Sequence, residues 1–295
     1  MSIRSSLVAL GAAACISVTP LAYAQTVAEQ LEQQAAQAYA QLINDAAVKG
    51  HLVAQNDPAA LRLRSIEQRL LPQAVRVNPR SSQWNWQVNL IDSAQVNAFC
   101  MPGGKIAFYT GLINRLALSD AEIAIVMGHE MTHALREHGV EQFRKQSYGQ
   151  VAERAGVALA SQIFNIDPQL LGAGAHIVDN LVQLRFSRAD ETEADHIGLE
   201  IAARAGFDPR AGLTLWEKMD RASQGNRLEF LSSHPGGPNR IRAIEAELPS
   251  VMPLYRAATG QPAERAPMRQ PERNQSRPAQ TETAPFLGRE MEQVH

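Results

Sequence analysis

Two histidines and a glutamate stand close together in residues 122–139, "EIAIVMGHEMTHALREHG". His129 and His133 are four residues apart, so on a helix they lie on one face, one turn apart, and can bind the same ion. Glu130 lies about 100° further around the helix, where its carboxylate can accept a proton from a metal-activated water. This pattern predicts one zinc ion per chain with a catalytic base beside it.

A catalytic zinc needs a third protein ligand and keeps one position open for water or substrate. In one class of metallopeptidase the third ligand is a histidine six residues after the second, but this chain has Gly139 there. His138 misses that position by one residue, and we expect it to face solvent. The third ligand must therefore come from another part of the chain.

A second class takes a glutamate from a later helix, and two glutamates are candidates. Glu153 stands alone in the alanine-rich residues 150–158, which is typical of a solvated charge. Glu191 shares a helical face with Asp195, because the two are four residues apart. The first carboxylate could bind zinc and the second could orient a ligating histidine. We therefore favour Glu191, and we expect Glu193 to point elsewhere.

The elements that must position these residues are mostly helical. Apolar side chains recur at helical spacing in residues 26–50 and again after Asp57-Pro58, a pair typical of a helix start. Ser119 and Glu122 have the spacing of a capping box, so the histidine helix should begin there, and we expect it to end near Gly139. Further helical patterns cover residues 150–164, 168–206 and 240–248, and another begins at Pro209.

A short β region precedes the histidine helix. Residues 84–91 alternate apolar and polar side chains, the period of a half-buried strand. Residues 95–100 and 105–110 flank Pro102-Gly103-Gly104, which predicts a hairpin turn that brings backbone close to a ligand. We expect residues 105–110 to be an edge strand that binds an extended substrate through Ile106 and Phe108. An ordinary core hairpin is the alternative.

The N-terminus has the layout of a signal peptide. Residues 1–24 contain a basic residue near the start, an apolar stretch, and Ala22-Tyr23-Ala24 at the expected cleavage position. A membrane anchor would need about 20 unbroken apolar residues, and Pro20 interrupts this stretch. We expect cleavage after Ala24 and export to the periplasm, with lipidation at Cys15 as a minor alternative.

The composition excludes some classes of protein. With 45% hydrophobic and 20% charged residues, the chain of 295 residues can bury a sizeable core. A formal net charge of -2 and the lack of a dense basic block argue against nucleic-acid binding. After export the remaining cysteine would be Cys100, which cannot form an internal disulfide and should be a small buried hydrophobe.

Four segments occur in a fixed order within residues 50–248: "NAFCMPGGKIAFYTGLI", "GHEMTHALREHG", "SRADETEADHIG" and "SSHPGGPNRI". Together they resemble the gluzincin metallopeptidases of peptidase family M48, the group that includes bacterial HtpX, BepA and LoiP and mitochondrial Oma. The resemblance implies an α+β fold that is mostly helical, with a small sheet or hairpin beside the active-site helix. It also implies zinc ligands and a general base, with Asp195 in the position of the motif's aspartate. The implied ligands are His129, His133 and Glu191, and the implied base is Glu130.

The resemblance extends to two residues near the C-terminal end of the domain. His234 matches a histidine that in some members approaches the metal and holds the enzyme latent; by itself it would be an ordinary surface-loop residue. Arg240 matches an arginine near the active site. Either side chain could stabilise the oxyanion of a tetrahedral intermediate. HtpX-like members carry membrane helices and BepA carries a repeat domain, so we expect this chain to be most similar to the small periplasmic type.

We therefore expect a periplasmic zinc endopeptidase that degrades unfolded or misassembled cell-envelope proteins, a substrate class implied by the resemblance alone. Its candidate associations are the outer membrane and an assembly machinery. The alternative is a chaperone or assembly factor for outer-membrane proteins with latent or no proteolysis. The expected organisation is a signal peptide (1–24), a helical segment (25–57), a zinc metallopeptidase domain (58–250) and a disordered tail rich in proline, glutamine and arginine (251–295).

Overall fold

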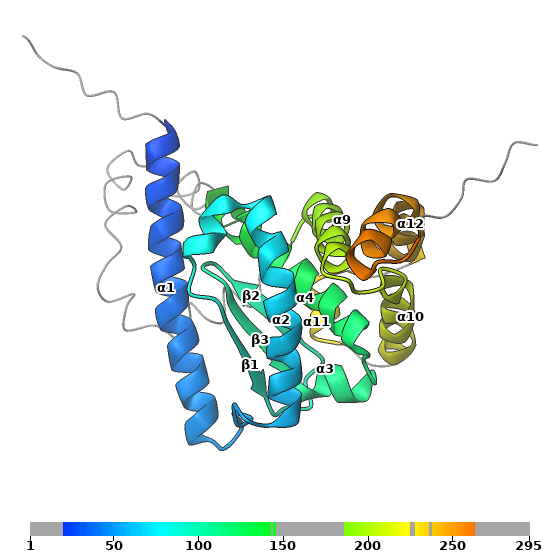
Figure 1. Cartoon of the computed structure of the whole chain (residues 1–295). Helices are drawn as coiled ribbons and strands as arrows, with labels where there is room; N and C mark the ends of the chain where they lie inside the picture. The colour runs from blue at the N-terminus through cyan, green and yellow to red at the C-terminus, as the bar shows by residue number, and fades with distance from the viewer. Residues whose placement is uncertain (1–19, 143, 146–185, 225–227, 236–237, 263–295) are drawn as a thin grey trace, which may run out of the picture. The chain divides into compact units, whose positions relative to one another are not determined.

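The computed structural model describes residues 20–142, 144–145, 186–224, 228–235 and 238–262 (Figure 1). The expectations for residues 1–19, for Glu153 and for the tail beyond residue 262 lie outside these ranges. Within them the chain is mostly helical with one small sheet, as the sequence predicts. None of the helices in the described part of the chain combines the length and apolar character that a membrane span requires.

Two long helices precede the sheet. The first, α1 (Pro20–Val48), contains the predicted helix and also runs through the expected cleavage position at Ala24. The second, α2 (Pro58–Val77), begins where the sequence predicts, because the Asp57 side chain accepts a hydrogen bond from the backbone N–H of Ala59 at 2.8 Å. A 3₁₀ turn, η1 (Pro79–Gln83), then leads into the sheet.

The sheet has three strands in the order β1-β3-β2. β2 (Ala98–Met101) and β3 (Lys105–Tyr109) form the predicted antiparallel hairpin, and β1 (Gln87–Ile91) pairs with β3 in parallel. β3 is therefore the central strand, and the prediction that it is an edge strand is wrong. Its residues Ile106 and Phe108 are fully buried in the core, so the strand has no free edge for a substrate.

The two glycines of the hairpin serve its turn. Gly103 has a φ of 78° and Gly104 has a φ of 76°, backbone conformations that residues other than glycine rarely adopt. A Cβ at Gly104 would also lie 2.6 Å from ring atoms of Trp86. The close packing on Trp86 is a further reason for glycine at this position, and the approach of the turn backbone to a ligand stays a prediction.

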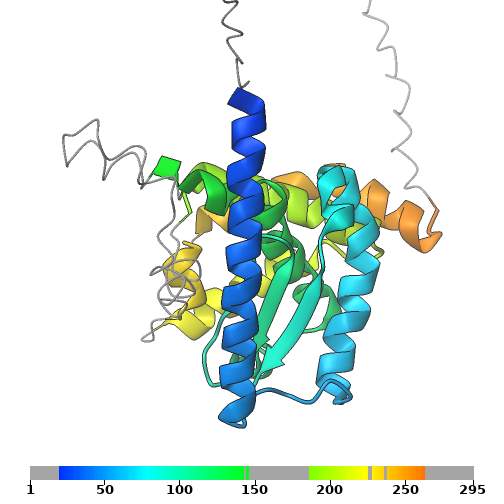
Figure 2. The same ribbon diagram turned by 90° about the vertical axis from the view of Figure 1, so that its left-hand side faces the viewer.

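The sheet lies between helices on both faces. On one face Ala35 and Tyr39 of α1 pack with Phe99 and Met101 of β2. Figure 2 shows α1 running along this side of the sheet. The other face joins the main core with α2 and with α4 (Asp120–Leu135). α3 (Thr110–Arg115) connects the central strand to α4.

The histidine helix α4 is buried along its length from residue 122 to residue 135. It begins with the predicted capping box: the Ser119 hydroxyl accepts a bond from the N–H of Glu122, whose carboxylate accepts one from the N–H of Ser119. The helix ends at Leu135, earlier than the expected Gly139. The amide of Asn78 donates to the Leu135 carbonyl at 3.0 Å, and the φ of 57° at Glu137 turns the chain away.

α4 is crossed closely by α9 (Arg188–Arg204). Gly128 and Gly198 meet at the crossing, and a Cβ on Gly198 would lie 2.7 Å from the backbone nitrogen of His129. The predicted continuous helix over 168–206 is wrong at residue 187. There Ser187 has extended backbone and its hydroxyl caps a new helix by accepting a bond from the N–H of Asp190.

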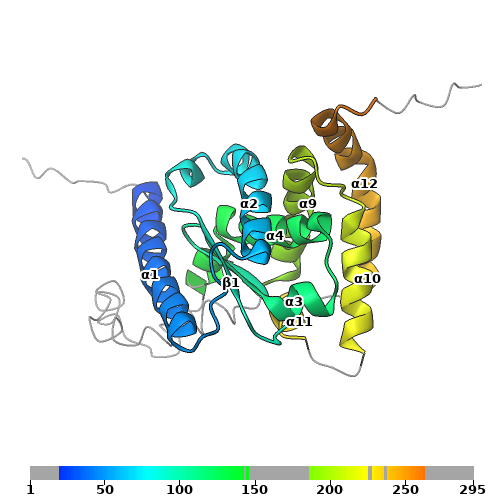
Figure 3. The same ribbon diagram turned by 60° about the horizontal axis from the view of Figure 1, so that its bottom comes forward.

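Besides a short helical stretch that begins at residue 138, three further helices belong to the described part of the domain. α10 (Ala211–Ser223) and α12 (Pro238–Thr259) lie beyond α9 on the side away from α1 (Figure 3). The short α11 (Phe230–Ser233) precedes His234. α12 continues past residue 250, where the sequence analysis expects the tail to begin, because Val251 is buried in the main core.

Candidate metal centre

Three of the predicted ligands converge where α4 crosses α9. The Nε2 atoms of His129 and His133 are 3.1 Å apart, as expected for residues one helical turn from each other. The Glu191 carboxylate, from the first turn of α9, lies 3.5 Å from His129 Nε2 and 3.4 Å from His133 Nε2. All three side chains are buried.

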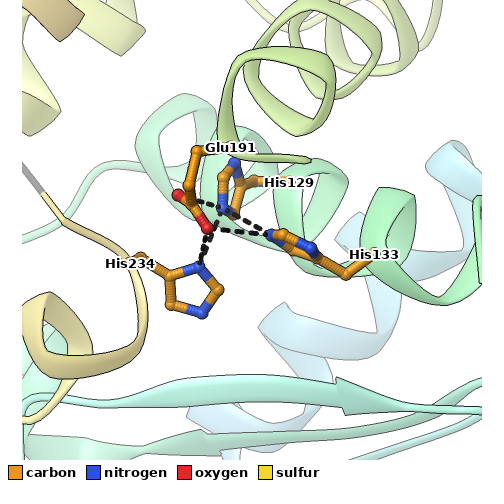
Figure 4. Close-up of side chains that lie close together, drawn as sticks. All are labelled: His129, His133, Glu191 and His234. Carbon is orange, nitrogen blue, oxygen red and sulfur yellow. Dashed lines mark hydrogen bonds and ion pairs between the residues drawn. The ribbon is translucent and has the colours of Figure 1, made fainter. Parts of the chain in front are cut away.

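His234 brings a fourth donor to the same point (Figure 4). Its Nδ1 atom lies 2.9 Å from Glu191 Oε1 and 3.2 Å from His129 Nε2. The four donor atoms all lie within 4.8 Å of one another. His234 is only 2% exposed, so the surface-loop alternative is wrong.

The donor set fits a zinc ion. Three imidazole nitrogens and one carboxylate oxygen are typical zinc ligands, and bonds of about 2.0 to 2.1 Å to a tetrahedral ion place neighbouring donors about 3.3 Å apart. Five of the six pairs of these residues approach to between 2.9 and 3.5 Å, with both oxygens of Glu191 taking part, and all four donors lie within 4.8 Å of one another. Burial lowers the pKa of His133 well below its ordinary value, which keeps the ring neutral and able to bind a metal.

Asp195 of α9 and Arg240 of α12 form hydrogen bonds with members of this cluster. Asp195 Oδ1 accepts a bond from Nδ1 of His129 at 3.0 Å, which directs His129 Nε2 toward the other donors. Arg240 donates to Glu191 Oε2 at 2.7 Å and to both carboxylate oxygens of Asp195, and its guanidinium lies 3.8 Å from the centre of the Trp216 ring. Arg240 therefore positions the carboxylates, and its expected role in stabilising an oxyanion stays a prediction.

Glu130 is buried next to the four donors. Within the described part of the chain its Oε1 atom has no hydrogen-bond partner, and it lies 3.4 Å from His234 Nε2. Burial raises the pKa of Glu130, while the nearby rings of His234 and His129 act in the opposite direction. A buried carboxylate oxygen without a partner is costly, and a water held beside a metal would satisfy it.

Two aromatic side chains enclose His234 and were not predicted. The His234 ring stacks on Phe230 of α11, with ring centres 4.6 Å apart. Phe186, directly before the Ser187 cap, stacks on His133 at 3.8 Å between centres and on His234 at 5.4 Å. Neither phenylalanine belongs to a spacing pattern, so only the fold reveals the contact.

His138 was predicted to face solvent, and this is wrong. It is 3% exposed, and its ring contacts both His133 and Glu193. Glu193 does point away from the four donors, as expected, and its carboxylate lies next to His138. The early end of α4 explains the error, because the sequence pattern places residue 138 on a continuing helix.

The predicted substrate contacts, Ile106 and Phe108, are buried in the central strand. In the described sheet β1 and β2 are the outer strands, and β2 is the one that packs against α4. A small recess beside His133 is lined by Cys100 and Met101 of β2 and by Phe186. Cys100 is a free thiol of intermediate exposure, less buried than expected.

The sequence is similar to a known family of metallopeptidases. The family model described as "Peptidase family M48" matches residues 60–248, which is more than half of the chain. The mitochondrial metalloendopeptidase OMA1 of Arabidopsis thaliana is 37% identical over 160 residues, covering 54% of this chain and 31% of the relative. OMA1 of Schizosaccharomyces pombe is also 37% identical, over 171 residues, covering 57% of this chain and 48% of the relative.

Two bacterial relatives match a similar part of the chain. The metalloprotease LoiP of Escherichia coli is 28% identical over 197 residues, covering 66% of this chain and 73% of the relative. The β-barrel assembly-enhancing protease of E. coli is 28% identical over 194 residues, covering 63% of this chain and 38% of the relative. The chain thus spans less than half the length of the OMA1 relatives named here. The matched region contains α2, the sheet and all four donors, and the chain belongs to peptidase family M48, whose members use zinc.

Proposed function

We propose that this protein is a zinc-dependent endopeptidase in which His129, His133 and Glu191 bind the metal. The supporting observation is the convergence of these three side chains beside a buried glutamate, Glu130, with an unpartnered oxygen. A purely structural zinc site needs only its ligands, so it would not require a buried glutamate beside them to act as a base. Family membership supports the same activity.

In the proposed mechanism, bound zinc supplies a Lewis acid that lowers the pKa of water and polarises the scissile carbonyl. Glu130 takes a proton from the attacking water through its free Oε1 and then delivers it to the leaving amine nitrogen. Asp195 keeps His129 in the orientation that presents Nε2, and Arg240 holds the Glu191 carboxylate in place. His234 lies 3.4 Å from Glu130 through its Nε2 atom, where it could donate to an oxyanion after leaving the position seen here.

The substrate strand is assigned to β2 in place of β3. In this proposal an extended peptide pairs with the edge of β2. Among the described strands of the sheet, β2 is the outer strand that packs against α4. The recess lined by Cys100, Met101 and Phe186 then accepts one substrate side chain next to His133. Backbone pairing of this kind favours unfolded chain over folded domains.

We further propose that the protein as described here is latent. His234 Nδ1 is within 3.2 Å of His129 Nε2 and 2.9 Å of Glu191 Oε1, so it takes the coordination position that water or substrate needs. Movement of the His234 segment would open that position.

The proposed substrates are unfolded or misassembled cell-envelope proteins, and the proposed location is the periplasm. The signal-peptide pattern of residues 1–24 supports export. The name of the E. coli β-barrel assembly-enhancing protease refers to assembly of β-barrel proteins, which supports an envelope role and association with an assembly machinery. The OMA1 relatives are mitochondrial by name, so the substrate assignment depends on the bacterial similarity.

Replacing Glu130 tests the activity. Glu130→Gln should lower the rate of casein cleavage by about 10² to 10⁴-fold while bound zinc stays near one ion per chain by metal analysis. Glu67→Gln is a matched control, because Glu67 is also a buried glutamate whose Oε1 lacks a partner but lies on α2. Wild-type cleavage by the Glu130 variant with zinc bound would refute the catalytic role of Glu130. Absence of zinc-dependent cleavage by the unaltered protein would favour the chaperone alternative.

A further inference from the structure

His133 has a second ring in contact with the nitrogen that faces away from the metal cluster. The Nδ1 atoms of His133 and His138 are 3.0 Å apart, and the two rings meet edge to face with their centres 5.0 Å apart. Both side chains are buried. The contact is therefore a specific nitrogen-to-nitrogen hydrogen bond inside the protein.

This contact exists because α4 stops early. On a continuous helix two residues five positions apart point about 140° away from each other, so the rings could not meet. Here α4 ends at Leu135, and Glu137 adopts a φ of 57°, which returns the chain over the last turn. Arg80 holds the Glu137 carboxylate at 2.9 Å and so stabilises the reversal.

The far side of the His138 ring is held by α9. Glu193 Oε2 lies 3.0 Å from His138 Nε2, and its other oxygen accepts a bond from Nε of Arg136 at 2.7 Å. Glu193 is two residues after the proposed ligand Glu191 and two residues before Asp195. The helix that supplies one ligand thus contacts the outer nitrogen of His129 directly, through Asp195, and that of His133 indirectly, through His138.

The partners determine where the ring protons lie. An ionised carboxylate accepts hydrogen bonds and donates none, so His138 carries its proton on Nε2, facing Glu193. In the tautomer that places this proton on Nε2, the Nδ1 atom of His138 is an acceptor, and His133 donates to it from its own Nδ1. His133 Nε2 is left with a lone pair directed at His129 and Glu191, which is the form that binds a metal.

We propose that His138 and Glu193 form an outer pair that fixes the tautomer and orientation of His133, as Asp195 does for His129. A single carboxylate reaches His129 directly, whereas a histidine bridges the distance between His133 and Glu193. Both are positioning residues that do not touch the substrate. The proposal rests on the zinc site and needs no turnover, so a protein that binds zinc without cleaving peptide bonds would still test it.

Zinc affinity of the full chain, measured by chelator competition at a fixed pH, is the test. His138→Phe keeps an aromatic ring without nitrogens and should weaken zinc binding about 10- to 100-fold, the usual cost of removing a partner of a ligating histidine. His138→Asn places an oxygen near the position of Nδ1 and should restore affinity to within about threefold of wild type. Wild-type affinity in the Phe variant, or equal losses in both variants, would overturn the proposal.

Glu193→Ala covers the case in which a substitution of the buried ring prevents folding, because the Glu193 side chain is 37% exposed. It should weaken zinc binding about threefold to tenfold by freeing His138 to rotate. His196→Ala is the matched control: His196 forms another histidine–glutamate pair at 3.0 Å, with Glu247, on the exposed side of α9. If the Glu193 and His196 variants bind zinc equally well, Glu193 has no part in the site.

Discussion

The two parts of the protein that supply donors to the metal centre are built differently. The crossing of α4 and α9 provides His129, His133 and Glu191 from long helices whose backbones touch at Gly128 and Gly198. His234 follows α11, a helix of four residues. Its backbone N–H bonds to the carbonyl of Phe230 at 2.9 Å, within the same turn.

We infer from this difference that the three donors on α4 and α9 keep their positions, whereas His234 can leave the metal centre. The crossing is stabilised by core packing that does not depend on a metal, so three donors keep their spacing whether or not zinc is bound. Two hydrogen bonds tie the α11 turn to Val96 in the loop before β2: the Phe230 N–H donates to the Val96 carbonyl, and the Val96 N–H donates to the Glu229 carboxylate. Fewer contacts hold it, so its position can change at a smaller cost in free energy.

The largest effect should come from separating the two helices. In Gly198→Ala the new methyl group would lie 2.7 Å from the backbone nitrogen of His129, which cannot move aside as a side chain can. We expect the free energy of unfolding to fall by about 3 kcal/mol and zinc binding to weaken with it. Urea unfolding of the metal-free protein and chelator competition measure the two quantities.

Gly212→Ala provides the control for that substitution. Gly212 also lies in a helix, α10, but its added methyl would meet only the ends of the Ile244 and Leu199 side chains, at 3.2 Å. These ends can shift, so stability should change by less than about 1 kcal/mol. Equal stability of the two variants would mean that the crossing tolerates wider spacing than we infer.

A smaller effect should follow zinc removal. Without the ion, His234 loses a partner, and amides of α11 should exchange their hydrogens about tenfold faster. Amides in the middle of α4 should change less, because packing protects them. Hydrogen exchange measured by mass spectrometry with and without a chelator checks this. Equal loss of protection in α4 and α11 would show that the crossing itself depends on the metal.

The smallest effect concerns the latent state. His234→Ala removes the donor that takes the open position, so casein cleavage should rise about threefold to tenfold, as expected if the closed arrangement occupies two thirds to nine tenths of the population. His196→Ala should leave the rate unchanged. An unaltered rate in the His234 variant would contradict latency, and a reduced rate would indicate that His234 takes part directly in the reaction.

Local signals in the sequence predicted the starts of the helices well. Asp57 before Pro58 and the Ser119–Glu122 pair act within a few residues, and the structure has both caps where the sequence predicts them. The donor cluster could also be anticipated, because Glu191 and Asp195 have helical spacing after the histidine motif. The caps and the spacing within each motif depend on neighbours along the chain, so one sequence is enough to find them. The meeting of the histidine pair with His234 joins distant segments, and only the family resemblance implied it.

Features set by contacts between distant residues could not be predicted. α4 ends where it does partly because Asn78, from another part of the chain, binds the carbonyl of Leu135. β3 is central because β1 pairs with it in parallel across a connection that includes β2. The positions of His138 and of the free strand edge follow from these contacts, which explains both errors.

The length of β2 has a consequence for the selection of targets. A strand of four residues, Ala98–Met101, spans only about 13 Å. In the proposed binding mode, a substrate chain therefore has to be unfolded over only a few residues to pair with it. Frayed ends and brief local openings would meet that requirement. Damage too slight to unfold a whole protein could then be sufficient to mark it for cutting.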